Sequence, residues 1–150
     1  MAKNLKTIKY NNGTAIPYMT DSTNLIASTP AYYLYNNDIA NKPIYGVLYN
    51  WYVVNTRKLC PLSWHVPTTE EWTTLTSVLG GESVAGGKLK ETGSTHWVSP
   101  NAGATNETGF TALPGGYRSI FGAFEGIGSY CAWWSATEYG DAGAYIRNVE

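Results

Sequence analysis

Residues 60–75, with the sequence CPLSWHVPTTEEWTTL, place four side chains of catalytic or metal-binding type within twelve positions. A thiol and an imidazole, Cys60 and His65, have the chemistry of a nucleophile and its base. With carboxylates such as Glu70 and Glu71 they also have the chemistry of zinc ligands. Zinc sites usually come from short spacings such as CxxC or HExxH, and this chain contains neither. A nucleophilic pair also needs an orienting group and an oxyanion hole, which the sequence does not indicate. We therefore predict no catalytic residue, no metal and no cofactor.

The same stretch fits the start of a helix better. Thr68 and Glu71 have the spacing of a capping box, in which each side chain bonds the other residue's backbone N–H. Apolar residues then recur at helical spacing until Gly80-Gly81 ends the run; they are Trp72, Leu75, Val78 and Leu79. In this interpretation Cys60 is a core residue, Trp64 fills core space and His65 hydrogen-bonds the backbone. The predicted scaffold residues of this stretch are Cys60, Trp64, Pro67, Glu71 and Trp72.

The rest of the chain predicts an α+β protein of about two helices, several short strands and much loop. Alternation, aromatic content and turn residues predict strands at 5–10, 31–35, 109–118 (around a turn at 114–116) and 121–139. Residues 45–55 are interpreted as a helix, with Leu48, Trp51 and Tyr52 facing inward. Loops are expected before residue 30, with Leu25 and Ile26 as anchors, at 36–43, and over the glycine-rich stretch 80–97.

Composition excludes several classes of function. Only 14 % of the 150 residues are charged, the net charge is −1, and Lys and Arg form no run longer than two. Nucleic-acid binding needs a basic surface, so we predict none. No apolar run approaches the roughly 18 residues of a membrane span. The length fits a single domain, 1–150. The opening MAKNLKTIKY is not a signal peptide, so a leader has been removed, export uses another route, or the protein stays inside the cell.

Five segments in order resemble one family, the Fibrobacter succinogenes major paralogous domain: NLKTIKYNNGTAIP, YGVLYNWY, CPLSWHVPTTEEWTTL, GGKLKETGSTHWVSPNAGATNETGFTALPGGYR and WWSATEY. The resemblance covers nearly the whole chain. That family is similar to a branch of the C-type-lectin fold near the formylglycine-generating, sulfatase-modifying enzymes. The resemblance implies a C-type-lectin-like α+β fold with mainly antiparallel strands. It also implies an extracellular or cell-surface location in Bacteroidetes-type bacteria, or a place on the virion of their phages.

The resemblance also implies where a ligand would bind. In some relatives the segment after the Trp-Trp-Ser motif resembles a variable region diversified by retroelements, with interchangeable side chains on a fixed scaffold. Carried over to this chain, Trp133, Trp134 and Ser135 are scaffold residues. The display positions are Glu138, Tyr139, Asp141, Tyr145, Arg147 and Asn148.

Three departures from the family pattern matter. Ser63 stands where members usually have Gly, and Cys131 is unusual beside the Trp pair. Members usually continue into strands that carry an Arg-Cys, whose Cys is a plausible partner for Cys60, whereas this chain stops at Glu150. Cys60 is therefore either free or paired with Cys131. Missing strands would leave a sheet edge unpaired, so we expect a fragment, or a sheet completed by association such as a homo-oligomer.

Three functions compete. A non-catalytic recognition or adhesion domain for a protein or glycan ligand is favoured, because Tyr, Asn, Ser, Thr and Gly are typical of antibody paratopes and Tyr139 or Tyr145 could stack on a sugar. The runner-up is a structural tip or fibre domain of a bacterial or phage surface assembly. The third is an oxidase like the formylglycine-generating enzymes, in which two cysteines bind copper. Thiols within reach of one soft metal, in an open cleft, would favour the oxidase.

Overall fold

The computed structural model describes residues 3–20, 29–140 and 143–150. Leu25, Ile26 and Asp141 therefore lie outside the described residues. The α+β prediction is confirmed, although the described part has four α-helices rather than two. The helices are α1 (Lys42–Tyr45), α2 (Trp51–Asn55), α3 (Thr69–Val78) and α4 (Glu82–Leu89), with 3-10 turns at Tyr35–Asn37 and Ile39–Asn41. The strands are β1 (Tyr32–Tyr33), β2 (Leu48–Tyr49), β3 (Gly115–Arg118), β4 (Phe124–Ile127), β5 (Cys131–Glu138) and β6 (Ala144–Val149).

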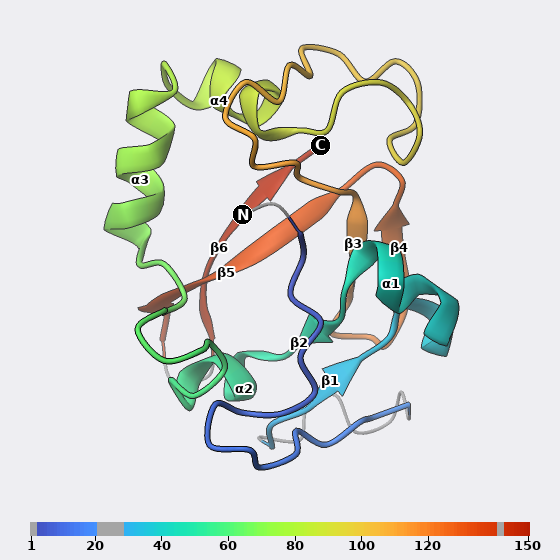
Figure 1. The fold of residues 1–150 in the computed structure, drawn as a ribbon, viewed down its shortest axis with the longest axis vertical. Helices are drawn as coiled ribbons and strands as arrows, with labels where there is room; N and C mark the ends of the chain where they lie inside the picture. Colours follow the sequence, from blue (N-terminus) through green and yellow to red (C-terminus); the bar gives the residue numbers. More distant parts are fainter. Residues whose placement is uncertain (1–2, 21–28, 141–142) are drawn as a thin grey trace.

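The strands form two sheets that are mostly antiparallel. The larger has the order β4-β3-β5-β6, in which only the β3–β5 pair is parallel, and the smaller pairs β1 with β2. Figure 1 shows β5 crossing the middle of the molecule, with α3 and α4 along one side and the N-terminal segment passing over the sheet. The β5–β6 register shifts between Trp134 and Glu138, an irregularity typical of a β-bulge.

Strand β5 separates two hydrophobic clusters. Trp133 packs on Trp72 of α3 and on Phe110, with ring centroids 5.9 and 5.3 Å apart. Trp134 packs on Trp51 of α2 at 6.1 Å, and its Nε1 donates to the carbonyl of Tyr49 at 2.8 Å. Because successive side chains of a strand point to opposite faces, the two neighbours serve different cores.

The predicted start of α3 is confirmed. Glu71 N donates to Thr68 Oγ1 at 3.3 Å, and Thr68 N donates to Glu71 Oε2 at 2.8 Å, which closes the capping box. His65 Nε2 lies 2.9 Å from the same carboxylate. The prediction that His65 bonds the backbone was therefore wrong: Glu71 serves both the helix and the loop before it. Val78, one of the apolar residues at helical spacing, is exposed because the helix covers the core only along the side of Trp72, Leu75 and Leu79.

Helix α4 was predicted as loop, and glycine content is the reason for the error. Ala85 and Leu89 are buried with Val149 of β6, but Gly86 and Gly87 between them hide the apolar period of the helix. A Cβ on Gly87 would lie 2.2 Å from the carbonyl oxygen of Gly103. The glycine is therefore needed for close approach of the loop after α4, which is a tertiary requirement that helix propensity does not report.

Three other segments also differ from the predictions. Residues 45–55 divide into β2 and α2, with Asn50 between them as an N-cap that accepts from Val53 N at 3.2 Å. The buried side chains of α2 are those of Trp51, Val53 and Val54. Of the other residues predicted to face inward, Leu48 and Tyr52 are half-buried. Residues 36–43 are mostly short helical turns, and residues 5–10 are extended but pair only through a bridge from Lys9 to Ala15. Within 109–118, Gly115 and Gly116 belong to β3 rather than to a turn.

The contact between α4 and the following loop makes a testable prediction. Gly87→Ala should lower the free energy of unfolding by about 1–3 kcal/mol, because the new methyl group meets backbone that must move. Gly86→Ala is the matched control, because its Cβ would meet only the Val149 side chain, at 3.3 Å, and Ala in a helix gains up to about 1 kcal/mol over Gly. Urea denaturation of both variants measures the difference, and equal stabilities would contradict this account of α4.

The capping box predicts a specific dependence of stability on pH. The Thr68 N–H, followed by His65, holds the pKa of Glu71 below its usual value. A lowered carboxyl pKa contributes stability that is present above the unfolded pKa and is lost as pH falls through the folded one. The stability difference between the wild type and Glu71→Gln should therefore shrink as pH falls from about 5 to about 3. Denaturation across that range measures it, with Glu70→Gln as the control for loss of first-turn charge; equal behaviour of the two variants would contradict the assignment.

Candidate functional site

Two exposed tyrosines meet where β5 turns into β6. Tyr139 follows β5 and Tyr145 lies in β6, and their rings pack edge to face with centroids 5.1 Å apart at 70°. Their exposed fractions are 67 % and 43 %. Tyr139 N donates to the carbonyl of Gly143 at 2.9 Å, which holds the two strands together at the turn. The two rings therefore support each other in an outward-facing position.

The loop before α3 carries a third exposed aromatic side chain, Trp64. Trp64 is 76 % exposed and Leu62 is 80 % exposed, so the prediction that Trp64 fills core space was wrong. Trp64 N donates to the Pro61 carbonyl at 3.0 Å, and Ser63 between them has a positive φ of 68°. This tight turn directs the segment outward, while the same loop buries Leu59 and half-buries Val66.

Hydrogen bonds place the loop beside the second half of β5. Ala136 N donates to the Pro67 carbonyl at 2.8 Å, and Thr69 N donates to Thr137 Oγ1 at 3.0 Å. Figure 1 shows the loop between α2 and α3 at the same end of the molecule as the end of β5. We call this surface the aromatic end and define it as Leu62, Trp64, Glu138, Tyr139 and Tyr145.

The predicted display positions do not all belong to the aromatic end. Glu138 is exposed and pairs with Ala144 across the hairpin, next to the two tyrosines. Arg147 is half-buried and donates from Nη2 to Thr73 Oγ1 of α3 at 3.2 Å. Asn148 lies farther along β6, opposite Ala132, and lines a hollow of about 530 Å³ beside α4. The structure thus groups Glu138, Tyr139 and Tyr145 and places Arg147 and Asn148 elsewhere.

The residues after the Trp pair attach this end to the rest of the fold. Ser135 is buried, its Oγ lies 3.0 Å from Thr69 Oγ1, and it accepts from Thr137 N at 3.0 Å. The scaffold positions predicted for Trp133, Trp134 and Ser135 correspond to these inward contacts.

The two cysteines are both free thiols. Cys131 is buried in the cluster with Leu89 and Val149, and burial raises its pKa to about 12, although Val149 and Lys90 act in the opposite direction. Cys60 is half-buried near the N-terminal segment, where its carbonyl accepts from Asn11, and burial raises its pKa too. Of the alternatives for Cys60, the free thiol is the one found. Within residues 3–20, 29–140 and 143–150, no three His, Cys, Asp or Glu side chains are grouped to hold a metal ion.

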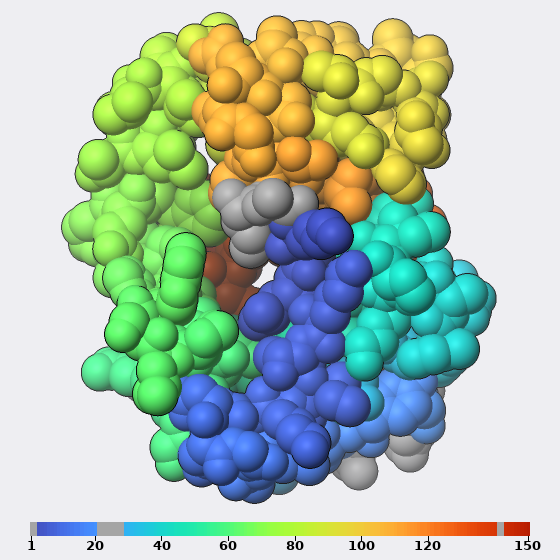
Figure 2. All heavy atoms as spheres, viewed as in Figure 1, coloured from blue at the N-terminus to red at the C-terminus, as the bar shows by residue number. Residues whose placement is uncertain are grey.

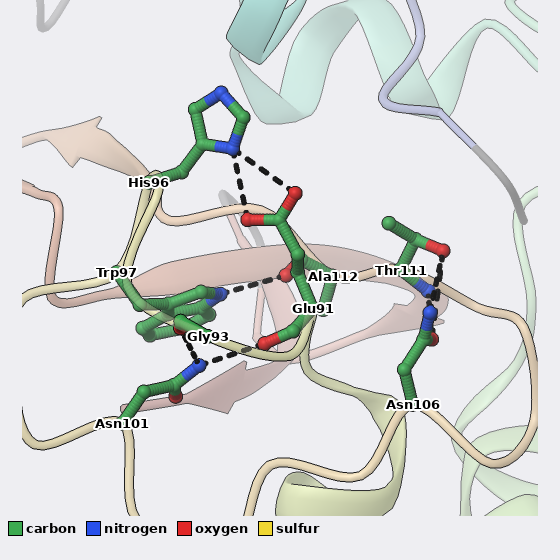
Figure 3. Close-up of polar contacts among 8 residues, drawn as sticks. All are labelled: Glu91, Gly93, His96, Trp97, Asn101, Asn106, Thr111 and Ala112. Carbon is green, nitrogen blue, oxygen red and sulfur yellow. Dashed lines mark hydrogen bonds and ion pairs between the residues drawn. The ribbon is translucent and has the colours of Figure 1, made fainter.

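A second group of polar side chains fastens the long loop after α4 (Figure 3). His96 Nδ1 lies 2.8 Å from a carboxylate oxygen of Glu91, and the ring packs edge-on against Tyr45. Asn101 Nδ2 donates to the carbonyls of Glu91 and Gly93 at 2.7 and 2.8 Å, and the buried Trp97 donates to Ala112 O at 2.9 Å. Since these bonds join parts of one loop to each other, the cluster is structural.

The large sheet ends at β6, which pairs only with β5 among the described strands. Figure 2 shows the face above it hollowed between the N-terminal segment, in blue, and the α3 side, in green, with dark-red atoms of the C-terminal segment at the bottom. The expectation that another chain segment or association completes the sheet stays a prediction.

Sequence reasoning missed Leu62 and Trp64. The signal available was their position between Pro61 and Pro67, which limits that segment to loop. What could not be inferred is that the turn at Ser63 directs the indole outward.

A comparison with models of known protein families supports the family resemblance seen in the sequence motifs. No helix among the described residues is long and apolar enough to cross a membrane. No curated protein and no solved structure matches the chain. The family model of the Fibrobacter succinogenes major domain matches residues 1–150. The chain therefore belongs to the Fibrobacter succinogenes major domain family.

Proposed function

We propose that this protein is a non-catalytic binding domain that recognises a protein or glycan through its aromatic end. The observation that carries the proposal is the exposure of Trp64, Tyr139 and Tyr145 from two segments joined by hydrogen bonds. Under this proposal the scaffold is C-type-lectin-like, and the domain acts outside the cell, at a cell surface or on a phage virion. Its display of side chains after the Trp-Trp-Ser motif follows the retroelement-diversified pattern.

The physical chemistry of the aromatic end suits recognition. Burying exposed apolar area contributes roughly 25 cal/mol per Å², and Trp and Tyr provide large areas with few rotatable bonds to immobilise. Tyr139 and Tyr145 already contact each other, so less ordering remains to be done on binding. The Glu138 carboxylate beside them accepts hydrogen bonds, which a glycan hydroxyl or a backbone N–H would donate.

The two alternatives make different demands. A tip or fibre domain would need a symmetric oligomer with a large apolar interface, which light scattering would detect. A copper-dependent oxidase would need both sulfurs as accessible thiolates on one metal. The burial of Cys131 against Val149 counts against that arrangement.

Replacing the tyrosine pair tests the proposal directly. A glycan array and a whole-cell binding screen identify ligands of the wild type, and Tyr139→Ala/Tyr145→Ala should then weaken binding at least about tenfold, as loss of central aromatic contacts does. Phe121→Ala is the matched control, because Phe121 is 88 % exposed but lies in the turn between β3 and β4. If the double variant binds as the wild type does, the ligand contacts a different surface.

Thiol reactivity tests the oxidase alternative. A disulfide reagent at pH 8 should modify Cys60 slowly in the folded protein and Cys131 only after unfolding, because the thiolate is the reactive form and burial disfavours it. Mass spectrometry of Cys60→Ser and Cys131→Ser assigns each site. Rapid reaction of both thiols, with copper bound by the wild type and lost in either variant, would instead support the oxidase.

A further inference from the structure

We propose a second binding site, at the opposite end of β5, that takes a methylated ammonium group such as a quaternary amine. The site is an open pocket of about 580 Å³ lined by Tyr117, Glu125, Gly126, Ser129, Tyr130 and Glu150. Its volume is within the range of small-molecule sites.

Strand pairing brings together residues of β3 and β4, the residues just before β5 and the residue just after β6. Tyr117 of β3 lies directly opposite Glu125 of β4. Cys131 lies opposite Val149, so Tyr130 and Glu150, one position beyond each, are neighbours at the end of the β5–β6 pair. Gly116 of β3 pairs with Cys131 of β5 and so joins the β3–β4 pair to the β5–β6 pair. The pocket thus lies at the edge where β3 and β4 meet the start of β5 and the end of β6.

The two tyrosine rings form a corner over a glycine. Their centroids are 5.2 Å apart and their planes meet at 63°. A Cβ on Gly126 would lie 2.9 Å from Tyr130 Cβ and 3.6 Å from the ring of Tyr117, and Gly126 has a φ of +77°. Only glycine satisfies both conditions, so this position lets the rings approach each other.

The charges around the corner favour a cation. Glu125 and Glu150 carry the carboxylates, and no Lys, Arg or His lines the pocket. Lys90 is buried, and its Nζ donates to the main-chain oxygen of Glu150 at 3.3 Å rather than to its side chain. The Tyr117 hydroxyl donates to Glu125 Oε2 at 2.7 Å, which fixes the carboxylate beside the rings and makes the Tyr117 ring more electron-rich.

Protonation supports the same conclusion. The hydrogen bond to Glu125 raises the pKa of Tyr117, and burial raises that of Tyr130, so both phenols stay neutral at physiological pH. Neutral electron-rich rings beside carboxylates bind organic cations through cation–π and Coulomb attraction. N-methyl groups suit this corner better than a bare ammonium, because they contact ring faces and carry less tightly held water.

The site is separate from the aromatic end. Strand β5 has eight residues, Cys131–Glu138, so Tyr130 and Tyr139 stand at its two ends, roughly 25–30 Å apart. The proposal therefore adds a ligand class to the proposed function and does not depend on it.

Choline and its neutral carbon isostere, 3,3-dimethylbutan-1-ol, test the inference in the wild type. NMR titration should show choline shifting the signals of Tyr117 and Tyr130, with a Kd on the order of 1 mM, and the isostere binding at least about tenfold more weakly. Equal binding of the isostere, no binding of choline, or preferential binding of methyl glucoside at these tyrosines would overturn the proposal.

Variants then locate the site. Glu125→Gln, close in shape to the wild-type side chain, should weaken choline binding about threefold to tenfold, while Tyr139→Ala/Tyr145→Ala should leave it unchanged. Thermal melts and NMR spectra without ligand check that each variant is folded, and the comparison of choline with its isostere in the wild type needs no variant. If the double variant loses choline binding, or if Glu125→Gln binds choline as tightly as the wild type does, the cation binds elsewhere and the assignment is overturned.

Discussion

The fold depends on two adjacent indoles that face in opposite directions from one strand. Trp133 joins Trp72 and Phe110 on the side of α3, and Trp134 joins Trp51 on the side of α2. Truncating a fully buried aromatic residue costs about 3–5 kcal/mol. Both indoles are half-buried, so each loses part of that amount, against the roughly 5–15 kcal/mol that holds a domain folded. Since each ring lies in a different cluster, neither replaces the other, and β5 has to stay between the two.

That constraint also determines which surface side chains are free to vary. Beyond Trp134 the register with β6 shifts, and the buried Ser135 contacts Thr69 at the start of α3. Residues up to Thr137 are thereby tied to the loop before α3 and to its first turn. Glu138, Tyr139 and Tyr145 are exposed and belong to neither cluster, so their side chains can change without disturbing the core, whereas Ala144 beside them packs on the cluster of Trp51. The boundary between scaffold and display thus follows from packing.

Local signals in the sequence predicted local structure well. Thr68 and Glu71 predicted the start of α3 because both residues of the capping box lie within four positions. Helix α4 was missed because Gly87 is required by the close approach of the Gly103 backbone, sixteen positions away, and rules based on neighbouring residues do not include that contact. The strand and helix in 45–55 were merged although Asn50, a good N-cap residue, marks the boundary. The display positions came from the family resemblance, but which of them meet depends on the hairpin register, so Arg147 and Asn148 could not be separated from Tyr145 beforehand.

Placing two kinds of surface at the ends of one strand has a consequence for binding. The aromatic end contains one carboxylate, Glu138, beside exposed rings, whereas the pocket at Tyr117 and Tyr130 has two carboxylates around a corner of rings. Sites more than about 10 Å apart that share no partners usually act additively. Between the two surfaces, β5 is held by packed indoles on both of its faces. Substitutions at one surface are therefore expected to leave the other unaltered.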